Sequence, residues 1–480
     1  MAGNIQTLVA LVLYLTIILG IGFLASIKIK THKDYYIGGK KLPGWALALS
    51  ERSTDMSAWL IISVPALAYT MGVSALWIPV GCYIGSIIQW VFYSKKLREE
   101  REKYDAVTAV DYLAKKHPDG ATGIRILGAI VCFMFFIFYV AAQFAGGGKI
   151  LGETFGVSMV WGIVITAIII IVYCIAGGFL SVVWTDVIQA LLMVVTLVVV
   201  PAVGLVTAHL QGLSLVSALA SAGPGMLSWT GGVKGAAAGL LIGTHLSWIF
   251  GYLGGEPHFF IRQMAVRSEK ERKTAVIIAI VWGALTTVGA WLVGAVALTL
   301  FGQGVVLDPE QILPYTLLHL TPPFVAGILL AGAIAGMMST ADSQLVVASS
   351  AVSEDLYHNV IHKGGEISEK KLIWISRIIT LTVGILAFVF AFTQTRVVYM
   401  LVSYGWAGLA GAFAPSITLS LWWKRFSKAG VYAAFIVGII TTIAWIVSGL
   451  DTILTVRIAS FVIPFPAAVI ASLLFPKEEI

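Results

Sequence analysis

The amino-acid sequence predicts an all-α polytopic membrane protein. Of its 480 residues, 59% are hydrophobic and 11% are charged, whereas about 25% of the residues of a soluble protein are charged. Apolar runs of about twenty residues recur along the chain, and a helix of that length spans a hydrocarbon core about 30 Å thick. These two observations exclude an ordinary soluble domain. The net charge of +7 lies mainly in short loops between the apolar runs, which argues against nucleic-acid binding.

Charged and Gly/Pro-rich breaks divide the chain into about thirteen predicted membrane spans. They form a single membrane domain that covers residues 1–480. The predicted spans are residues 6–27, 44–70, 75–93, 124–151, 157–176, 182–206, 235–253, 274–300, 324–352, 372–390, 398–421, 430–447 and 454–475.

Alternate loops between these spans are strongly basic, and by the positive-inside rule they face the cytoplasm. The N-terminus is therefore predicted outside and the C-terminus inside the cell inner (plasma) membrane, as an odd number of spans requires. The basic loop residues are Lys28, Lys30, Lys33, Lys40 and Lys41; Lys95, Lys96, Arg98, Arg101 and Lys103; Arg262, Arg267, Lys270, Arg272 and Lys273; Lys363, Lys370 and Lys371; and Lys424, Arg425 and Lys428.

Two predicted spans are interrupted by polar residues or glycines. The second carries the polar run from Ser50 to Ser57, and the seventh carries four glycines and a proline between Gly243 and Pro257. Unwound backbone at membrane depth is tolerated where it lines a cavity or is buried in protein, and transporters bind their substrates at such breaks. The two broken spans lie five apart. Spans two to six and seven to eleven therefore predict two inverted five-helix repeats, over residues 44–206 and 235–421.

A third polar site lies at the end of the ninth span. Ser339, Thr340 and Ser343 place their hydroxyls on roughly one helix face. Hydroxyl and carbonyl oxygens suit a weakly held alkali cation, and no His or Cys joins the group to favour a transition metal. Carboxylates inside a bilayer are costly unless they are paired, protonated or bound to a cation, which makes three aspartates functional candidates: Asp55, Asp186 and Asp342.

The chain resembles the sodium/solute symporter family, and its proline-transporting bacterial members in particular. The resemblance covers nearly the whole chain and implies a LeuT-like fold, with an extra N-terminal helix and first inner loop in residues 1–43 and two further helices in residues 422–480. It rests on residues 36–43, 55–60, 177–186, 189–190, 248, 252, 257–258, 262, 331–340, 344, 349–350, 354–357 and 402–408.

The resemblance also implies roles for individual residues. A sodium ion between the second and ninth spans is held by backbone carbonyls and two hydroxyls, from Ser53, Met56, Gly336, Ser339 and Thr340. A second sodium site, or a proton site, involves Asp186, Asp342 and Ser343. The substrate pocket is lined by Ser57, Tyr139, Trp248, Tyr252 and Pro257. Asp55 matches an aspartate that is important for sodium coupling in proline-type members.

The chain departs from the family pattern at three places. Glu51 and Arg52 replace small residues and are expected to brace the unwound segment or to gate the inner side. The stretch that ends at Pro257 is one residue longer and contains Glu256, which bears on substrate preference. Asp342 stands where a neutral residue is common. Elsewhere, Lys149 with Glu153 and Glu354 with Asp355 are expected to be surface groups.

These features predict a sodium-coupled symporter that imports a small organic solute by alternating access, with L-proline as the first candidate. Alternative solutes are another amino acid, a betaine, pantothenate, a monocarboxylate or a sugar acid, and a membrane solute sensor is a further alternative. No enzyme is expected, because the sequence shows no nucleophile with a base, metal cluster or nucleotide loop. The expected partners are the solute, sodium ions and the bilayer, with no cofactor, nucleic acid or obligate protein partner.

Overall fold

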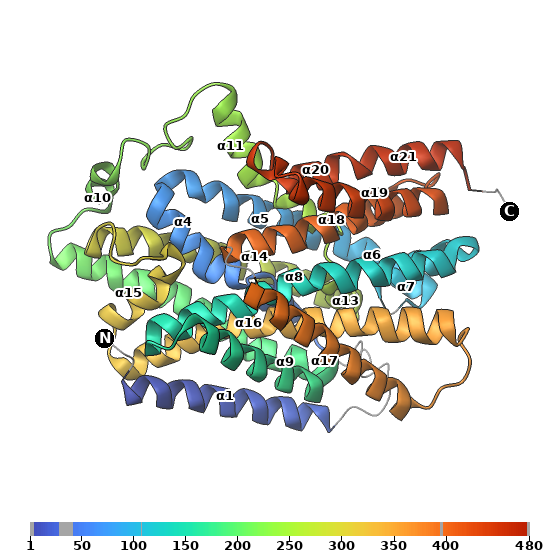
Figure 1. Cartoon of the computed structure of the whole chain (residues 1–480), viewed down its shortest axis with the longest axis horizontal. Coiled ribbons are helices and arrows are strands. Elements are labelled where there is room, and N and C mark those ends of the chain that lie inside the picture. The colour runs from blue at the N-terminus through green and yellow to red at the C-terminus, as the bar shows by residue number, and fades with distance from the viewer. Residues whose placement is uncertain (1–3, 28–41, 107, 394–396, 478–480) are drawn as a thin grey trace.

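The computed structural model describes residues 4–27, 42–106, 108–393 and 397–477, and all the secondary structure in these ranges is helical (Figure 1). The predicted basic loop at residues 28–41 lies outside the described residues, as does most of the motif at residues 36–43. The helices of the first half are α1 (Ile5–Ser26), α3 (Gly44–Asp55), η2 (Trp59–Ser63), α4 (Val64–Met71), η3 (Gly72–Leu76), α5 (Trp77–Ile88), η4 (Gln89–Tyr93), α6 (Ser94–Tyr104), α7 (Ala109–Lys116), η5 (Pro118–Gly120), α8 (Ala121–Phe155), α9 (Met159–Leu210) and α10 (Leu215–Ala222).

The second half of the chain is helical as well. Its helices are α11 (Ala236–Leu246), α12 (Ile249–Tyr252), α13 (Pro257–Met264), α14 (Glu269–Phe301), η6 (Pro309–Gln311), α15 (Ile312–Leu320), α16 (Pro323–Ser350), η7 (Ala351–Ile361), α17 (Glu369–Thr393), α18 (Val398–Trp422), α19 (Lys428–Val447), η8 (Leu450–Thr452), α20 (Val456–Val462) and α21 (Pro464–Leu474).

Among the described residues, ten helices are long and apolar enough to cross a membrane, or eleven when the bent pair α11–α12 with α13 counts as one span. The prediction of about thirteen is higher because the second and third predicted spans share one continuous helical stretch, and because the apolar part of the fifth, Met159–Val172, is a shorter helix. Residues 59–104 are helical without a gap and hold part of the second predicted span and all of the third, but Gly72 at the end of α4 has φ 64° and ψ −131°, which breaks the helical geometry there. The fifth and sixth predicted spans lie in α9, which bends at Gly178, where φ is 63°.

Two helices form the interior of the molecule. In the most apolar stretch of α18, 94% of the residues are buried, and in the run formed by α16 and η7 the share is 78%. The corresponding shares are 33% for both α1 and α17, whose large apolar side chains face outwards. A surface of this kind is suited to lipid. The polar residues predicted on α16 are thus placed at the centre of the fold.

The charged residue Lys149 is not a surface group, contrary to expectation. It is buried at the end of α8, and its Nζ lies 2.5 Å from Glu310 Oε2 and 2.6 Å from Asp308 Oδ2. The Glu310 carboxylate also accepts hydrogen bonds from the Ser63 hydroxyl (2.7 Å) and from the backbone N–H groups of Val398 and Tyr399. The η6 segment therefore ties together η2, α8 and the start of α18.

Neutralising this carboxylate is expected to destabilise the protein. The variant Glu310→Gln leaves Lys149 with the partly exposed Asp308 as its carboxylate partner, and unpairing a buried charge costs about 3–5 kcal/mol before such compensation. We expect a lower unfolding temperature in detergent micelles. Glu153→Gln, the same chemical change on α8, serves as the control, and equal unfolding temperatures for the two variants would contradict the assignment.

The second expected surface group is also buried in part. Asp355 is fully buried and pairs with Arg125 of α8, which in turn lies 2.6 Å from Asp111 of α7. Asp355 also accepts a hydrogen bond from the Thr108 hydroxyl at 2.9 Å. The expectation of a solvated helix end is therefore wrong at Asp355. The pairing joins η7 to α7 and α8, which lie far from it in the sequence.

Candidate ion and solute site

The first predicted helix break is confirmed at the end of α3. Met56 leaves the helical conformation, with φ −84° and ψ 58°, and the helix resumes at η2. Side chains satisfy backbone groups that the break releases. The Trp59 indole N–H donates to the Asp55 carbonyl oxygen at 2.8 Å, and Gln143 of α8 accepts from the Ala58 N–H at 3.1 Å. Side chains therefore stabilise the break, because buried backbone groups require hydrogen-bond partners.

The second predicted break is confirmed as well. The α11–α12 segment and α13 meet at an angle of 45°. Between them, Gly254 has a φ of 83°, which favours glycine because it lacks a Cβ. Pro257 opens α13, where its missing N–H leaves no intrahelical bond unmade. The first break therefore follows the buried helix α3, and the second precedes the buried helix α13.

The hydroxyls of Ser339 and Thr340 on α16 meet the backbone of α3 just before its break. Ser339 Oγ lies 2.9 Å from the Ser53 carbonyl oxygen and 3.2 Å from that of Gly336. Thr340 Oγ1 lies 2.7 Å from the Thr54 carbonyl oxygen of α3 and 2.9 Å from that of Gly336. The Met56 carbonyl oxygen is also close, since a Cβ added to Gly336 would lie 3.0 Å from it. All these residues are fully buried or nearly so.

This group of oxygens has the chemistry that a sodium ion requires. It consists of neutral hard donors, carbonyls and hydroxyls, and they come from both a broken and a continuous helix. Such donors suit an alkali cation that must bind and leave, whereas a transition metal prefers nitrogen or sulfur ligands. In this structure the hydroxyls donate to the carbonyl oxygens. When a cation binds, the hydroxyl hydrogens can rotate away, so that both the hydroxyl and the carbonyl oxygens face the cation.

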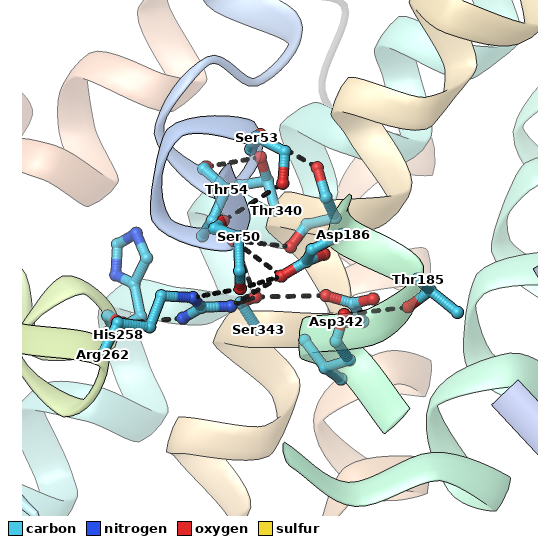
Figure 2. Close-up of polar contacts among 12 residues, drawn as sticks. Ser50, Ser53, Thr54, Thr185, Asp186, His258, Arg262, Thr340, Asp342 and Ser343 are labelled. Carbon is cyan, nitrogen blue, oxygen red and sulfur yellow. Dashed lines mark hydrogen bonds and ion pairs between the residues drawn. The ribbon is translucent and has the colours of Figure 1, made fainter. Parts of the chain in front are cut away.

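Beside this group, Arg262 of α13 reaches into the interior and pairs with Asp186 of α9 (Figure 2). Arg262 Nη2 lies 2.9 Å from Asp186 Oδ2 and 2.5 Å from Ser343 Oγ, and Nε donates to Ser50 Oγ at 2.7 Å. The Ser50 hydroxyl donates in turn to Asp186 Oδ2 at 2.5 Å. One guanidinium therefore connects α3, α9 and α16.

Arg262 was predicted as a loop charge, and this prediction is wrong. The side chain is buried, and so is the whole of α13. A signal for burial was present in the sequence, because Phe259, Phe260, Ile261 and Met264 surround it. The prediction instead followed the alternation of basic loops, which placed Arg262 in a cytoplasmic loop. Only the packing of α13 against α3 and α16 reveals that the arginine points inwards.

The three residues predicted for a second cation site do lie close to one another. The Ser343 hydroxyl donates to Asp342 Oδ1 at 3.1 Å and lies 3.0 Å from the Thr54 hydroxyl. Thr54 is 3.4 Å from Asp186 Oδ2 as well. The positive charge next to Asp186 in this structure is the guanidinium of Arg262. A cation bound here would therefore compete with Arg262 for the carboxylate.

Glu51 and Arg52 form a buried charge network with Asp55. Arg52 donates to both carboxylate oxygens of Glu51, at 2.6 and 2.7 Å, and its Nη1 lies 3.1 Å from Asp55 Oδ2. The Trp90 indole N–H donates to Glu51 Oε2 at 2.9 Å, and the Tyr252 hydroxyl donates to Asp55 Oδ1 at 2.8 Å. The network links the end of α3 to η4 and to the second broken helix.

Aromatic rings surround the break of α3 on its other side. Trp248 stacks on Trp59 with 5.9 Å between ring centroids and contacts Trp406 edge-on at 5.5 Å. Tyr252 contacts the same Trp406 ring at 5.0 Å. Tyr139 of α8 is fully buried. Trp248, just before α12, thus packs against η2, and Ser57 and Pro257 lie at the two breaks themselves.

The sequence reasoning did not identify Arg457 of α20, which borders these rings. Its guanidinium carbon lies 4.3 Å from the centroid of a Trp248 ring, and its Nε donates to the Ser247 hydroxyl at 3.0 Å. It also donates to Ser403 of α18. The residue lies in one of the C-terminal helices added to the repeats, where no helix break pointed to a site.

Comparisons with known proteins agree with this architecture. The profile described as "Sodium:solute symporter family" matches residues 35–438. The chain is 33% identical over 478 residues to the osmoregulated proline transporter OpuE of Bacillus subtilis (strain 168), covering 98% of this chain and 95% of the relative. It is 34% identical over 445 residues to the high-affinity proline transporter PutP of the same organism, covering 92% of each.

A solved structure shares the fold over nearly the entire chain. It is that of a Na+-coupled sialic acid symporter in a substrate-bound outward-open state, with a TM-score of 0.81 at 23% sequence identity, covering 99% of both chains. The predicted LeuT-like, all-helical fold class is therefore confirmed.

Proposed function

The chain belongs to the sodium:solute symporter family, and we propose that it imports L-proline together with sodium by alternating access. One observation carries the proposal: the oxygens of Ser53, Met56, Gly336, Ser339 and Thr340 converge where the broken helix α3 meets α16. Proline as the solute is supported by the similarity to proline transporters along more than nine-tenths of the chain.

In this proposal, sodium and solute stabilise the same arrangement of the broken helices. Sodium joins the carbonyls of Ser53 and Met56 to the hydroxyls on α16, and the solute binds on the other side of the α3 break. There it contacts Ser57, Tyr139, Trp248, Tyr252 and Pro257, while Asp55 orients Tyr252 through its hydrogen bond. Sodium promotes solute binding only as far as it prefers the arrangement that forms the pocket. Loss of sodium on the low-sodium side then releases the solute.

Glu51 and Arg52 are assigned a bracing role in the same proposal. Arg52 holds Glu51 and Asp55 on one face of α3, so that the helix end keeps its position when the unwound segment moves. Asp186, Asp342 and Ser343 are assigned to a second cation site. Filling that site requires a cation to replace the guanidinium of Arg262 beside the Asp186 carboxylate. The Arg262–Asp186 pair would therefore be closed without the cation and open with it.

The proposed orientation has the N-terminus outside and the C-terminus in the cytoplasm. It is supported by the ends of the molecule in Figure 1, where α1 begins at the end that carries α10 and α15, and α21 finishes at the end that carries α6 and α7. The latter end has the basic run of α6, which includes Lys95, Lys96, Arg98, Arg101 and Lys103. Basic segments of this kind remain on the cytoplasmic side.

Uptake of labelled proline into proteoliposomes tests the function directly. An inward sodium gradient is compared with equimolar potassium and with a proton gradient alone. Accumulation of proline that requires the sodium gradient supports the proposal. Sodium-driven uptake of another solute from a panel of amino acids, betaines, pantothenate and monocarboxylates, without proline uptake, would overturn the substrate. Absence of sodium-driven uptake for every solute would overturn the coupling.

A further inference from the structure

Glu256 is a buried carboxylate that the proposed sodium and proline sites do not use. It precedes α13 at the second helix break and is 2% exposed. Neither of its carboxylate oxygens has a hydrogen-bond partner among the described residues. It lies in the stretch that is one residue longer than in the proline-type pattern. A buried carboxyl group of this kind calls for a chemical explanation.

The nearest basic group is the imidazole of His258, which is fully buried. His258 Nδ1 lies 3.4 Å from Glu256 Oε2, and neither ring nitrogen has a hydrogen-bond partner among the described side chains and backbone. The rings of Phe136 and Phe259 pack against the imidazole, with centroids at 5.6 and 4.2 Å. The ring of Tyr139 also lies edge-on to the imidazole at 6.2 Å, so His258 is enclosed by aromatic rings.

The buried guanidinium groups of α3 and α13 pair with other carboxylates. Arg52 is shared between Glu51 and Asp55, and Arg262 is bound to Asp186. Transfer of an unpaired carboxylate into an apolar interior costs many kcal/mol, so that such a group takes up a proton instead. Among the described residues no guanidinium pairs with Glu256, so this arrangement favours its neutral form, the carboxylic acid.

The surroundings reinforce the same protonation state. The ionisable groups that act electrostatically on Glu256, or on which it acts, are Asp55 of α3 and Tyr139 and Cys132 of α8, in addition to His258 of α13. Asp55 is a carboxylate, and two nearby carboxylates resist being ionised together. On the α18 side, Gly255 packs against Ala410, which is apolar.

We propose that Glu256 is a proton-binding site, so that a proton accompanies sodium and the solute during transport. The proposal rests on the proposed symport function. The carboxylate takes up a proton when the site opens outwards, and the O–H bond of the acid breaks when the site opens inwards. The proton then passes to a neutral nitrogen of His258 or to water and leaves to the cytoplasm, and the carboxylate left behind is protonated again from outside.

Proteoliposomes that contain a pH-sensitive dye test the proposal. Sodium is equal on both sides, and proline is added outside. Wild-type vesicles are expected to acidify internally when proline enters. The Glu256→Gln variant keeps the shape of the side chain but cannot bind or release the proton. We expect its proline-dependent acidification to fall by about tenfold or more, with sodium-driven accumulation of proline retained within about threefold.

Glu153→Gln is the matched control and is expected to acidify like the wild type, because Glu153 lies at the far end of α8. Wild-type vesicles that accumulate proline on a sodium gradient without acidification would overturn the proton site while leaving the transport function in place. Acidification that persists in Glu256→Gln would overturn it as well. If this variant fails to fold, Glu256→Asp is used, which retains an ionisable carboxyl group and is expected to retain acidification.

A lack of sodium-driven proline accumulation by the wild type would instead contradict the proposed substrate. The proton measurement is then made with the solute from the panel that does accumulate. The two failures are therefore read from separate signals in the same vesicles, the labelled solute and the dye.

Discussion

Removing either hydroxyl where α16 meets the α3 break is expected to raise the sodium concentration for half-maximal uptake by about tenfold to a hundredfold. Hydrogen-bond or ion contacts of a charged group contribute about 1.5–3 kcal/mol, and about 1.4 kcal/mol corresponds to a factor of ten. The variants are Ser339→Ala and Thr340→Ala. Each leaves the backbone oxygens of Ser53 and Gly336 in place. Proline uptake, measured over a series of sodium concentrations at constant ionic strength, gives the half-maximal value.

Folding is expected to change little in both variants, because one neutral hydrogen bond contributes about 0.5–1.5 kcal/mol to stability. Ser349→Ala and Ser350→Ala are the matched controls. These hydroxyls lie on the same helix and bond to the carbonyls of Val346 and Val347 within it. They are expected to keep the wild-type sodium dependence. An unchanged sodium dependence in Ser339→Ala and Thr340→Ala would remove both hydroxyls from the ion site.

The variant Arg262→Met is expected to lose transport and to unfold more easily. It leaves the buried carboxylate of Asp186 without its guanidinium and also removes bonds to Ser50 and Ser343. Loss of one partner from a buried pair costs about 3–5 kcal/mol. Thermal unfolding in detergent micelles measures the destabilisation, and sodium-driven uptake measures function. Added sodium is expected to restore part of the stability, because a cation can replace the guanidinium beside Asp186.

The double variant Asp186→Asn with Arg262→Met separates pairing from packing. Removing both charges abolishes the unpaired carboxylate, so the double variant is expected to be more stable than Arg262→Met alone. Arg267→Met, at an exposed position after α13, is the control and is expected to behave like the wild type. If the single and double variants are equally unstable, the charge pair is not what Arg262 contributes to stability.

The positions of the membrane helices follow from local sequence patterns. Long apolar runs form helices because backbone groups in lipid must bond within the segment. The breaks at Ser50–Ser57 and Gly243–Pro257 were identifiable for the converse reason, since polar and glycine-rich stretches are unfavourable in lipid. Span boundaries were less certain near Gly72 and Gly178, where the backbone leaves helical geometry although the helical stretches on both sides follow one another without a gap.

Some residues of the candidate site could be identified from local sequence patterns, and others could not. Ser339, Thr340 and the aspartates were identifiable because polar groups are rare and costly at membrane depth. Arg262 and Lys149 were placed at the surface, since both lie near the ends of apolar runs, where positive charges are common. Their carboxylate partners, Asp186 and Glu310, are 76 and 161 positions away in the chain.

The membrane class, the approximate spans, the two broken helices and the hydroxyl cluster of Ser339, Thr340 and Ser343 could be predicted from the residue pattern alone. Each of these depends on the balance between apolar and polar residues within about one helix, and that balance is read along the chain. Tertiary packing was needed to learn which buried charges are partners, and that the Glu256 carboxylate has no hydrogen-bond partner among the described residues. Pairing depends on where a long side chain points after helices distant in sequence have packed, and the free energy of a buried charge is set by those neighbours.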